Sequence, residues 1–261
     1  MSKALYYKTK EEIELIRESS LLVGKTLGEV AKVIKPGVTT LSLDKLAHEF
    51  INDHKAVPAF LNLYGFPNSL CISVNAHVVH GIPSKYELKD GDIVSVDCGV
   101  VKNKFFGDSA FTFPVGEVKP EVLNLLKVTR ESLYKGIEMA VVGKRLFDIS
   151  DAVQTHAESN GYSVVRELVG HGIGQNLHES PEVPNYGKKG TGLKLQEGLT
   201  IAIEPMINLG KKNIIQENDG WTIRTADNLP SAHFEHTVAI GKDKADILSS
   251  FDYVDEVLNK K

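Results

Sequence analysis

The chain has 261 residues, of which 42% are apolar and 25% are charged, and its formal net charge is -4 at pH 7. This composition is typical of a globular protein with a sizeable core, and the charge gives no general attraction to nucleic acid or to an anionic membrane. No apolar run approaches the roughly 20 residues that cross a bilayer, and the start lacks the apolar stretch of a signal peptide. Two cysteines, Cys71 and Cys98, are too few for a disulfide framework or a cysteine-based zinc site. We therefore expect a cytoplasmic protein with neither nucleic acid nor membrane as a partner.

The first fifty residues predict two helices. Thr9 and Glu12 have the spacing of a capping box, and Pro36 and Gly37 are expected to end the helix that follows. Between them, apolar residues recur at helical spacing: Ile13, Ile16, Val23, Leu27, Val30 and Ile34. The second helix is expected to turn these residues inward: Leu43, Leu46, Ala47, Phe50 and Ile51.

The pattern then changes to strands and repeats itself. Residues 71–74, 93–96 and 111–113 are β-rich, a helical period returns from Glu121, and a second β-rich set runs from 199 to 240. Shifting the chain by 106 aligns Leu27 with Leu133, and shifting it by 107 aligns Asp97 with Glu204. Helices followed by strands, twice over, favour an internal duplication. With no Pro- or Ser-rich linker between the halves, we expect one domain over residues 1–261, with halves of roughly 1–118 and 119–261.

The segment from 92 to 113 predicts a hairpin that brings two aspartates together. Residues 101–104 are expected to form the turn, and with Lys102 and Asn103 as its central pair Asp97 lies directly opposite Asp108. Opposed side chains lie about 4.5–5.5 Å apart at Cβ, where two carboxylates repel. A solvated acidic edge is the alternative interpretation. The apolar neighbours indicate burial, so a bound cation explains the pair better: Val94, Val96, Phe111 and Phe113.

Three more candidates for a metal site lie in the second half. Glu204 and Glu235 stand in β-rich, largely apolar runs, where a glutamate is unusual unless it is paired or bound to metal. His171 stands among the glycines of residues 170–174, which leave its imidazole free to enter a cleft, although a lone loop histidine is more often structural. Four carboxylates and one imidazole form an oxygen-rich set that suits two divalent ions such as Mn, Fe, Co, Zn or Ni. Paired metals lower the pKa of a bridging water and generate hydroxide at neutral pH.

Other catalytic motifs fail on single residues. Gln175 stands where a dinucleotide-binding loop needs glycine, and Phe111 stands where a serine-hydrolase elbow needs glycine. Glu182 stands where a zincin helix needs its second histidine.

Together the motifs resemble the type I, bacterial-type methionine aminopeptidases of the pita-bread fold. The resemblance covers nearly the whole chain and rests on Asn75, residues 80–83, 91–108, 170–174, 178–179, 204–205 and 235–237. It implies an α+β fold in which two pseudo-symmetric αβ halves share a curved antiparallel sheet, with helices on the outer face. It also implies removal of the N-terminal methionine from peptides and nascent proteins when the second residue is small. In that reaction a hydroxide bridging two divalent metals attacks the scissile carbonyl.

The resemblance further assigns the ligands. Asp97 chelates one ion, His171 and Glu204 hold the other, and Asp108 and Glu235 bridge both.

Two histidines are implied to contact the substrate. His178 hydrogen-bonds near the scissile amide, while His80 stabilises the intermediate or passes a proton to the leaving amine. Glu204 accepts a proton from the nucleophilic water. The alternatives are a turn residue before Pro83 for His80 and a solvated loop residue for His178.

The resemblance also implies a methionine pocket, for which ordinary core packing is the alternative. Leu63 stands where tyrosine is common and Leu177 where phenylalanine is common, which predicts a roomier pocket that keeps its methionine specificity. A flexible thioether fits an apolar cleft of this kind. A monovalent cation is implied near Asn75 and Ser231. The pocket residues are Phe60, Leu63, Phe66, Cys71, Leu177 and Trp221.

The implied partners are N-terminal Met-peptides and nascent chains, with transient ribosome contact, for a monomeric enzyme. A proline-specific peptidase of the same fold is one alternative, although such relatives usually carry a large N-terminal domain and the pattern here starts within the first dozen residues. A non-catalytic module that binds nascent N-termini is another. Fold relatives of that kind have lost metal ligands, whereas all five are present here.

Overall fold

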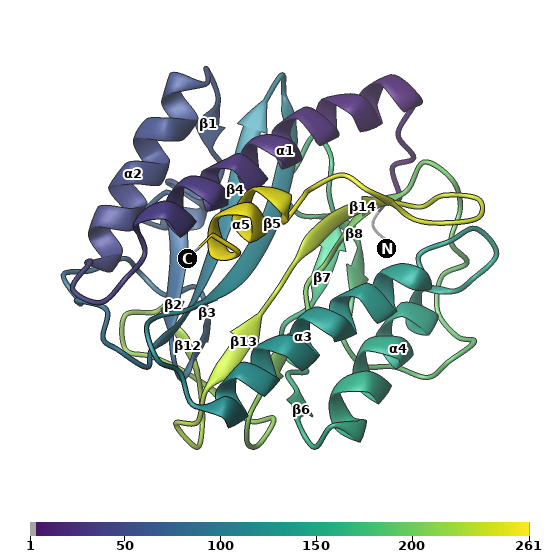
Figure 1. Cartoon of the computed structure of the whole chain (residues 1–261). Helices are drawn as coiled ribbons and strands as arrows, with labels where there is room; N and C mark the ends of the chain where they lie inside the picture. Colours follow the sequence, from purple (N-terminus) through teal and green to yellow (C-terminus); the bar gives the residue numbers. More distant parts are fainter. Residues whose placement is uncertain (1–3, 261) are drawn as a thin grey trace.

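Helices cover one face of antiparallel strands in the computed structural model, which describes residues 4–260 (Figure 1). The helices are α1 (Lys10–Val33), α2 (Thr40–Asp53), α3 (Pro120–Glu138), α4 (Leu146–Ser159) and α5 (Asp252–Leu258), with a short 3-10 turn at Leu63–Gly65. The strands are β1 (Val57–Pro58), β2 (Leu70–Val74), β3 (His77–Val79), β4 (Ile93–Lys102), β5 (Phe105–Pro114), β6 (Ser163–Val164), β7 (Gly170–Gly172), β8 (Glu179–Val183), β9 (Thr200–Ile203), β10 (Met206–Asn208), β11 (Ile214–Gln216), β12 (Ile223–Thr225), β13 (Ser231–His233), β14 (His236–Ala239) and β15 (Asp246–Ile247).

The first helix begins as the sequence predicts. The backbone N–H of Glu12 donates to Thr9 Oγ1 at 3.2 Å, and the N–H of Thr9 donates to Glu12 Oε2 at 2.8 Å, which completes the capping box. The helix ends at Val33, and Gly37 takes a left-handed φ of 85°. In α2 the inward residues Leu43, Ala47 and Ile51 are fully buried, whereas Leu46 and Phe50 are half-buried.

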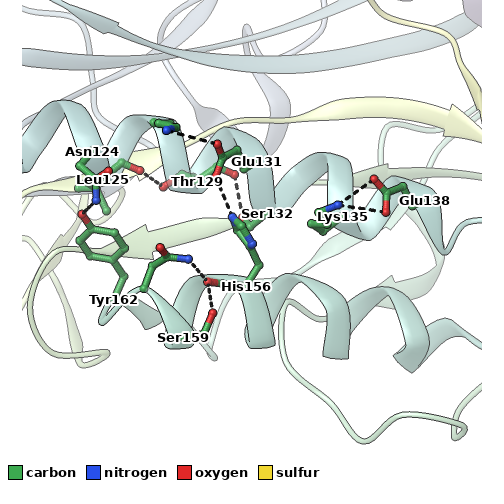
Figure 2. A network of polar contacts seen from close by, with 12 residues as sticks. Asn124, Leu125, Thr129, Glu131, Ser132, Lys135, Glu138, His156, Ser159 and Tyr162 are labelled. Atoms are coloured by element: carbon green, nitrogen blue, oxygen red, sulfur yellow. Dashed lines mark hydrogen bonds and ion pairs between the residues drawn. The ribbon is translucent and has the colours of Figure 1, made fainter.

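Helices α3 and α4 form the second pair. His156 Nε2 of α4 lies 3.0 Å from Glu131 Oε2 of α3, and Asn124 Nδ2 of α3 donates to the hydroxyl of Tyr162, just after α4, at 2.7 Å (Figure 2). Gly143 precedes α4 with a φ of 92°, as Gly37 precedes α2. These parallels agree with the duplication inferred from the sequence, which stays a prediction.

Every pair of named strands is antiparallel, as predicted. Strand β4 pairs with β5 along one edge and with β1 and β2 along the other. In the second half, the order is β15-β14-β9-β7-β8. Two smaller sheets, β13-β10-β6 and β11-β12-β3, complete the arrangement.

The predicted register of the β4–β5 hairpin is wrong by two residues. Asp97 pairs with Ala110, and Asp108 pairs with Gly99, because the central turn residues are Asn103 and Lys104, with φ of 52° and 67°. A shift of two leaves each side chain on its original face, since side chains alternate along a strand. The two aspartates therefore still share a face, as diagonal neighbours rather than an opposed pair.

The two halves of the chain meet where β5 runs beside residues 233–237, which lie in and between β13 and β14. The backbone N–H of Glu235 donates to the carbonyl of Ala110 at 2.9 Å. Three hydroxyls add contacts to the same backbone: Ser109 Oγ to Glu235 O (2.6 Å), Thr112 Oγ1 to His233 O (2.7 Å) and Thr237 Oγ1 to Asp108 O (2.8 Å). These bonds hold the main chain of residues that carry the site described below.

The core lies between the helices and the strands. Val23 and Leu27 of α1 belong to one cluster with Val94 and Val96 of β4 and Phe113 of β5. Asp97 points to the opposite face, because it is out of phase with Val94 and Val96. Within residues 4–260, no helix is long and apolar enough to span a membrane.

Candidate active site

A cavity of about 640 Å³ opens on the face of the strands away from α1. One wall is polar and the other is apolar. Its lining includes all of the predicted metal, substrate and pocket residues: Phe60, Leu63, Phe66, Cys71, His80, Asp97, Asp108, His171, Leu177, His178, Glu204, Trp221 and Glu235.

The five predicted ligands come from five different places in the chain. Asp97 lies on β4, Asp108 on β5 and His171 on β7, while Glu204 directly follows β9 and Glu235 lies between β13 and β14. Asp108, His171 and Glu235 each offer a ligand atom, and these atoms lie within 4.8 Å of one another. The first half of the chain thus supplies two carboxylates, and the second half supplies the imidazole and the other two carboxylates.

The imidazole of His171 has a fixed tautomer. Its Nδ1 lies 2.9 Å from the carbonyl oxygen of Gly172, which can only accept a hydrogen bond, so Nδ1 carries the proton. Nε2 therefore presents a lone pair to Asp108 Oδ2 and Glu204 Oε1, each 3.7 Å away. A lone pair facing two carboxylate oxygens is unfavourable unless a cation lies between them.

Several buried atoms at this wall have no hydrogen-bond partner among residues 4–260: Asp97 Oδ1, Asp108 Oδ1, Glu235 Oε1 and His233 Nε2. Buried polar atoms are nearly always paired, so such a group of exceptions needs an explanation. Divalent cations bound by carboxylates and imidazole supply one, and the donor set suits ions such as Mn, Fe, Co or Zn.

Burial also shifts the pKa of each of these carboxyls upward. Burial, with Glu204 nearby, raises the pKa of Asp97 to about 7, and burial raises the pKa of Glu204 to about 8. The pKa values of Asp108 and Glu235 rise well above their usual range, first through burial and then through the neighbouring carboxylates. Without a cation the cluster therefore resists full ionisation. Burial lowers the pKa of His171 to about 3, so its imidazole is neutral and able to bind metal at pH 7.

Sequence reasoning missed one histidine of this cluster. His233 is 1% exposed, and its Nε2 lies 3.5 Å from Glu204 Oε2. Burial lowers the pKa of His233, so the ring is neutral. The signal was available, because His233 and Glu235 are two residues apart in an alternating run and so share a face.

The two predicted substrate-contacting histidines differ in exposure. His80 follows β3 with a left-handed φ of 57°, and burial lowers its pKa to about 4. His178 is exposed, and its ring meets the ring of His171 edge-on at 4.6 Å. The exposed ring of Tyr64, which no sequence argument selected, stacks parallel to His178 at 6.4 Å and also lines the cavity.

The apolar wall brings the predicted methionine pocket together. One cluster contains Phe60, Phe66, Cys71 and Leu177 with Ile173, and Leu63 and Trp221 pack against it. The rings of Phe66 and Trp221 meet edge-on at 5.2 Å. Cys71 is the cross-strand partner of Asp97, so the pocket borders the carboxylate cluster directly.

Asn75 and Ser231 lie next to each other and outside this lining. The N–H of Ser231 donates to the Asn75 carbonyl at 2.9 Å, and Asn75 Nδ2 donates to Asp92 Oδ1 at 2.7 Å. Ser231 Oγ donates to Asn208 Oδ1 at 2.8 Å. The monovalent cation near this pair stays a prediction.

A buried carboxylate–imidazole cluster in a cavity, on a fold of helices over antiparallel strands, is typical of a metal-dependent enzyme. The sequence profile of metallopeptidase family M24 matches residues 14–242. The chain is therefore a member of this family of metal-dependent peptidases.

Relatives narrow the assignment within that family. The methionine aminopeptidase of Clostridium perfringens (strain 13 / Type A) is 52% identical over 242 residues, which cover 93% of this chain and 97% of the relative. Methionine aminopeptidase 1 of Bacillus subtilis (strain 168) is 48% identical over 242 residues, covering 93% and 98% respectively. The chain belongs to the methionine aminopeptidases of family M24.

Solved structures agree with the assignment. The methionine aminopeptidase of Rickettsia prowazekii superposes with a TM-score of 0.93 at 43% identity and covers 95% of this chain and 100% of its own. The Xaa-Pro dipeptidase of Bacillus anthracis superposes with a TM-score of 0.75 at 17% identity, and the match spans 62% of that longer chain. The second likeness concerns the fold alone, and together they bear out the pita-bread architecture expected from the sequence.

Proposed function

We propose that the chain removes the N-terminal methionine from peptides and nascent proteins whose second residue is small. The observation that carries this proposal is the cavity itself. Buried, unpaired carboxylate and imidazole atoms form one wall, and an apolar pocket bordered by Cys71 and Trp221 forms the other. A peptide with an apolar first side chain fits these two walls with its scissile bond beside the carboxylates.

The metal-binding residues in this proposal are the five predicted from the sequence: Asp97, Asp108, His171, Glu204 and Glu235. Their unpaired buried atoms and the fixed tautomer of His171 support it. Divalent ions held by these residues would supply Lewis-acid chemistry, polarising the scissile carbonyl and lowering the pKa of the attacking water. Mn, Fe, Co, Zn and Ni all suit the donor set.

Protein groups supply the remaining chemistry. His178 is proposed to donate a hydrogen bond near the scissile amide. Its side chain is exposed and lines the cavity, which supports contact with a substrate. His80 has a pKa lowered to about 4, so its neutral ring favours a hydrogen-bond role at the intermediate over storage of a proton for the leaving amine. Glu204 is proposed to accept a proton from the nucleophilic water, and its place at the end of β9 in the lining of the cavity supports this role.

The apolar wall is proposed to hold the methionine side chain. Leu63 and Leu177 have smaller side chains than the tyrosine and phenylalanine common at these positions, and leave room for the flexible thioether. From the family resemblance, we also propose that the approach beyond the scissile bond is narrow and excludes a large second residue.

Further parts of the proposal rest on the family resemblance. They are a cytoplasmic, monomeric enzyme with transient ribosome contact, a single domain with an internal repeat, and a monovalent cation near Asn75 and Ser231. The unpaired cysteines, Cys71 and Cys98, support a reducing compartment.

The test is release of free methionine from Met-Ala-Ser by metal-stripped protein, with and without added Mn or Co. We expect release only with metal, and none from Met-Lys-Ser, because the lysine side chain is too large for the second position. Preferential cleavage of an Xaa-Pro peptide points instead to a proline-specific peptidase. Peptide binding without release under any divalent ion points to a binding module.

A further inference from the structure

The N-terminal segment reaches the cavity through one buried ion pair. Lys8 Nζ lies 2.5 Å from Glu179 Oε2, and each side chain is only 4% exposed. Burying two charges is costly unless their remaining hydrogen-bonding atoms are also satisfied. Here Lys8 Nζ also donates to the Tyr6 carbonyl at 3.1 Å, and Glu179 Oε1 accepts from the N–H of Asn176 at 3.1 Å.

The ion pair brackets two residues of the cavity. Glu179 directly follows His178, and its carboxylate bonds the backbone of Asn176, which directly precedes Leu177. One carboxylate thus spans the turn that presents His178 to substrate and Leu177 to the methionine pocket. If the carboxylate moves, both side chains move with it.

The other partner is anchored to rigid structure. Lys8 stands directly before Thr9, the N-cap of α1, and its own N–H donates to the Gly198 carbonyl at 2.7 Å. Leu5 forms a parallel bridge to Ser180, one residue beyond Glu179. Residues 5–8 therefore lie along the loop that carries His178 and hold it at several points.

Gly174 has no side chain, and the ion pair occupies the space that a side chain there would fill. A Cβ at this position would lie 2.4 Å from Lys8 Cε and 2.8 Å from Glu179 Oε1. Gly174 does not have the left-handed backbone that demands glycine, so the requirement comes from space alone. The last glycine of the run at residues 170–174 is thereby explained by Lys8 and Glu179 and not by the metal cluster.

We propose that Lys8 and Glu179 are positioning residues that hold His178 and Leu177 in their working places. The expected effect on kinetics rests on the proposed function, whereas the expected effect on the position of His178 does not. A buried ion pair fits this task because either charge alone is costly, so the loop has one strongly favoured geometry.

The experiment compares Lys8→Met and Glu179→Gln with a matched control, Asp255→Asn. Asp255 pairs with Arg130 at 2.5 Å on the helix-covered side, where both side chains are 32% exposed. We expect Lys8→Met and Glu179→Gln to lower kcat/KM for Met-Ala-Ser by about ten- to a hundredfold, as small misplacements in an active site do. Asp255→Asn should lower the Tm and leave kcat/KM unchanged.

A second readout does not depend on turnover. The imidazole NMR signals of His178 sense the rings of Tyr64 and His171, and we expect them to shift in Lys8→Met and Glu179→Gln but not in Asp255→Asn. Gly174→Ala should reproduce these shifts. The double variant Lys8→Met/Gly174→Ala should lose no more kcat/KM than Lys8→Met alone, because both changes act on one contact.

Unchanged kinetics and unchanged His178 signals in folded Glu179→Gln and Gly174→Ala proteins would overturn the proposal, whatever happens to the Tm. If Lys8→Met does not fold, these two variants still decide. If the unaltered protein releases no methionine with any metal, the proposed function fails, and the His178 signals alone then decide the positioning role.

Discussion

Asp219 shows, at the scale of one residue, how a side chain outside the cavity fixes a residue inside it. Its Oδ1 accepts the N–H groups of Trp221 and Thr222 at 2.9 and 2.8 Å, and its Oδ2 accepts the Thr222 hydroxyl at 2.6 Å. Although burial opposes ionisation, these bonds hold the pKa of Asp219 below its usual range. The turn before β12 therefore places Trp221 against Phe66 in the pocket.

Asp219→Ala removes these bonds and should loosen Trp221. We expect the KM for Met-Ala-Ser to rise about five- to tenfold with little change in kcat, a loss of about 1–1.4 kcal/mol of binding. Trp221 is the single tryptophan of the chain, so its fluorescence reports the change directly.

Asp227→Ala is the matched control, since Asp227 accepts the N–H groups of Lys211 and Leu229 in another turn, at 2.7 and 3.2 Å. Asp227→Ala should change neither the fluorescence of Trp221 nor the KM for Met-Ala-Ser. An unaltered emission spectrum in Asp219→Ala would show that Trp221 is held by its apolar contacts instead.

Candidate site residues could be predicted from the sequence where a charged side chain stands in an apolar run. Asp108 and Glu235 stand out because carboxylates are rare in apolar strands, and the structure buries both. His233 was missed because a strand histidine has many ordinary uses. Lys8 and Glu179 were missed as a pair because 171 positions separate them, and no local pattern reports such a contact.

At the scale of secondary-structure elements, the β4–β5 hairpin has an unusual turn. Asn103 and Lys104 both have positive φ, which Asn tolerates and Lys does not favour. The central pair predicted from the sequence was wrong because a lysine gives no signal of a left-handed backbone conformation.

Lys104→Gly should relieve that conformation. We expect the free energy of unfolding to rise by about 1 kcal/mol, measured by urea denaturation, with kcat/KM unchanged. Lys102→Gly is the control, since Lys102 lies in β4 opposite Phe105, where glycine should destabilise by about 0.5–1 kcal/mol. A stabilising Lys102→Gly, or a destabilising Lys104→Gly, would contradict the observed turn.

The longer elements were predictable and the shorter ones were not. The capping box and apolar period fix α1, and the repeated apolar period fixes α3, because each signal extends over several turns. Strands such as β6, with two residues, and β11, with three, carry too few positions for any alternation to be detected. They are set by the strands they pair with.

At the scale of the whole molecule, the carboxylate cluster joins the two halves of the chain, and its charge depends on pH. The pKa values of Asp97 and Glu204 are raised to about 7 and about 8, from 3.8 and 4.5. A carboxyl with a raised folded-state pKa holds its proton more tightly in the folded protein. Its stabilising contribution is therefore fully present below the unfolded-state pKa values of 3.8 and 4.5, and it is lost as the pH rises from there through 7 and 8. Bound cations reverse this trend because they favour the ionised carboxylates.

The increase in Tm on adding Mn to metal-stripped protein should therefore be larger at about pH 8 than at about pH 5. Metal binding at neutral pH should also release protons, which calorimetry in buffers of different ionisation enthalpy measures. Asp108→Asn, which removes a proposed ligand whose pKa is raised by both Asp97 and Glu204, should reduce both effects. A metal-induced Tm increase that is the same at both pH values would mean that these carboxylates are already ionised without metal.

The wide spacing of the cluster along the chain also sets when it can form. Asp97 and Asp108 are synthesised well before Glu235, which lies close to the end of the 261-residue chain. Glu235 reaches them only once β5 and the segment between β13 and β14 are hydrogen-bonded. The full ligand set of the proposed metal site is thus assembled only after the segment between β13 and β14 has folded against β5.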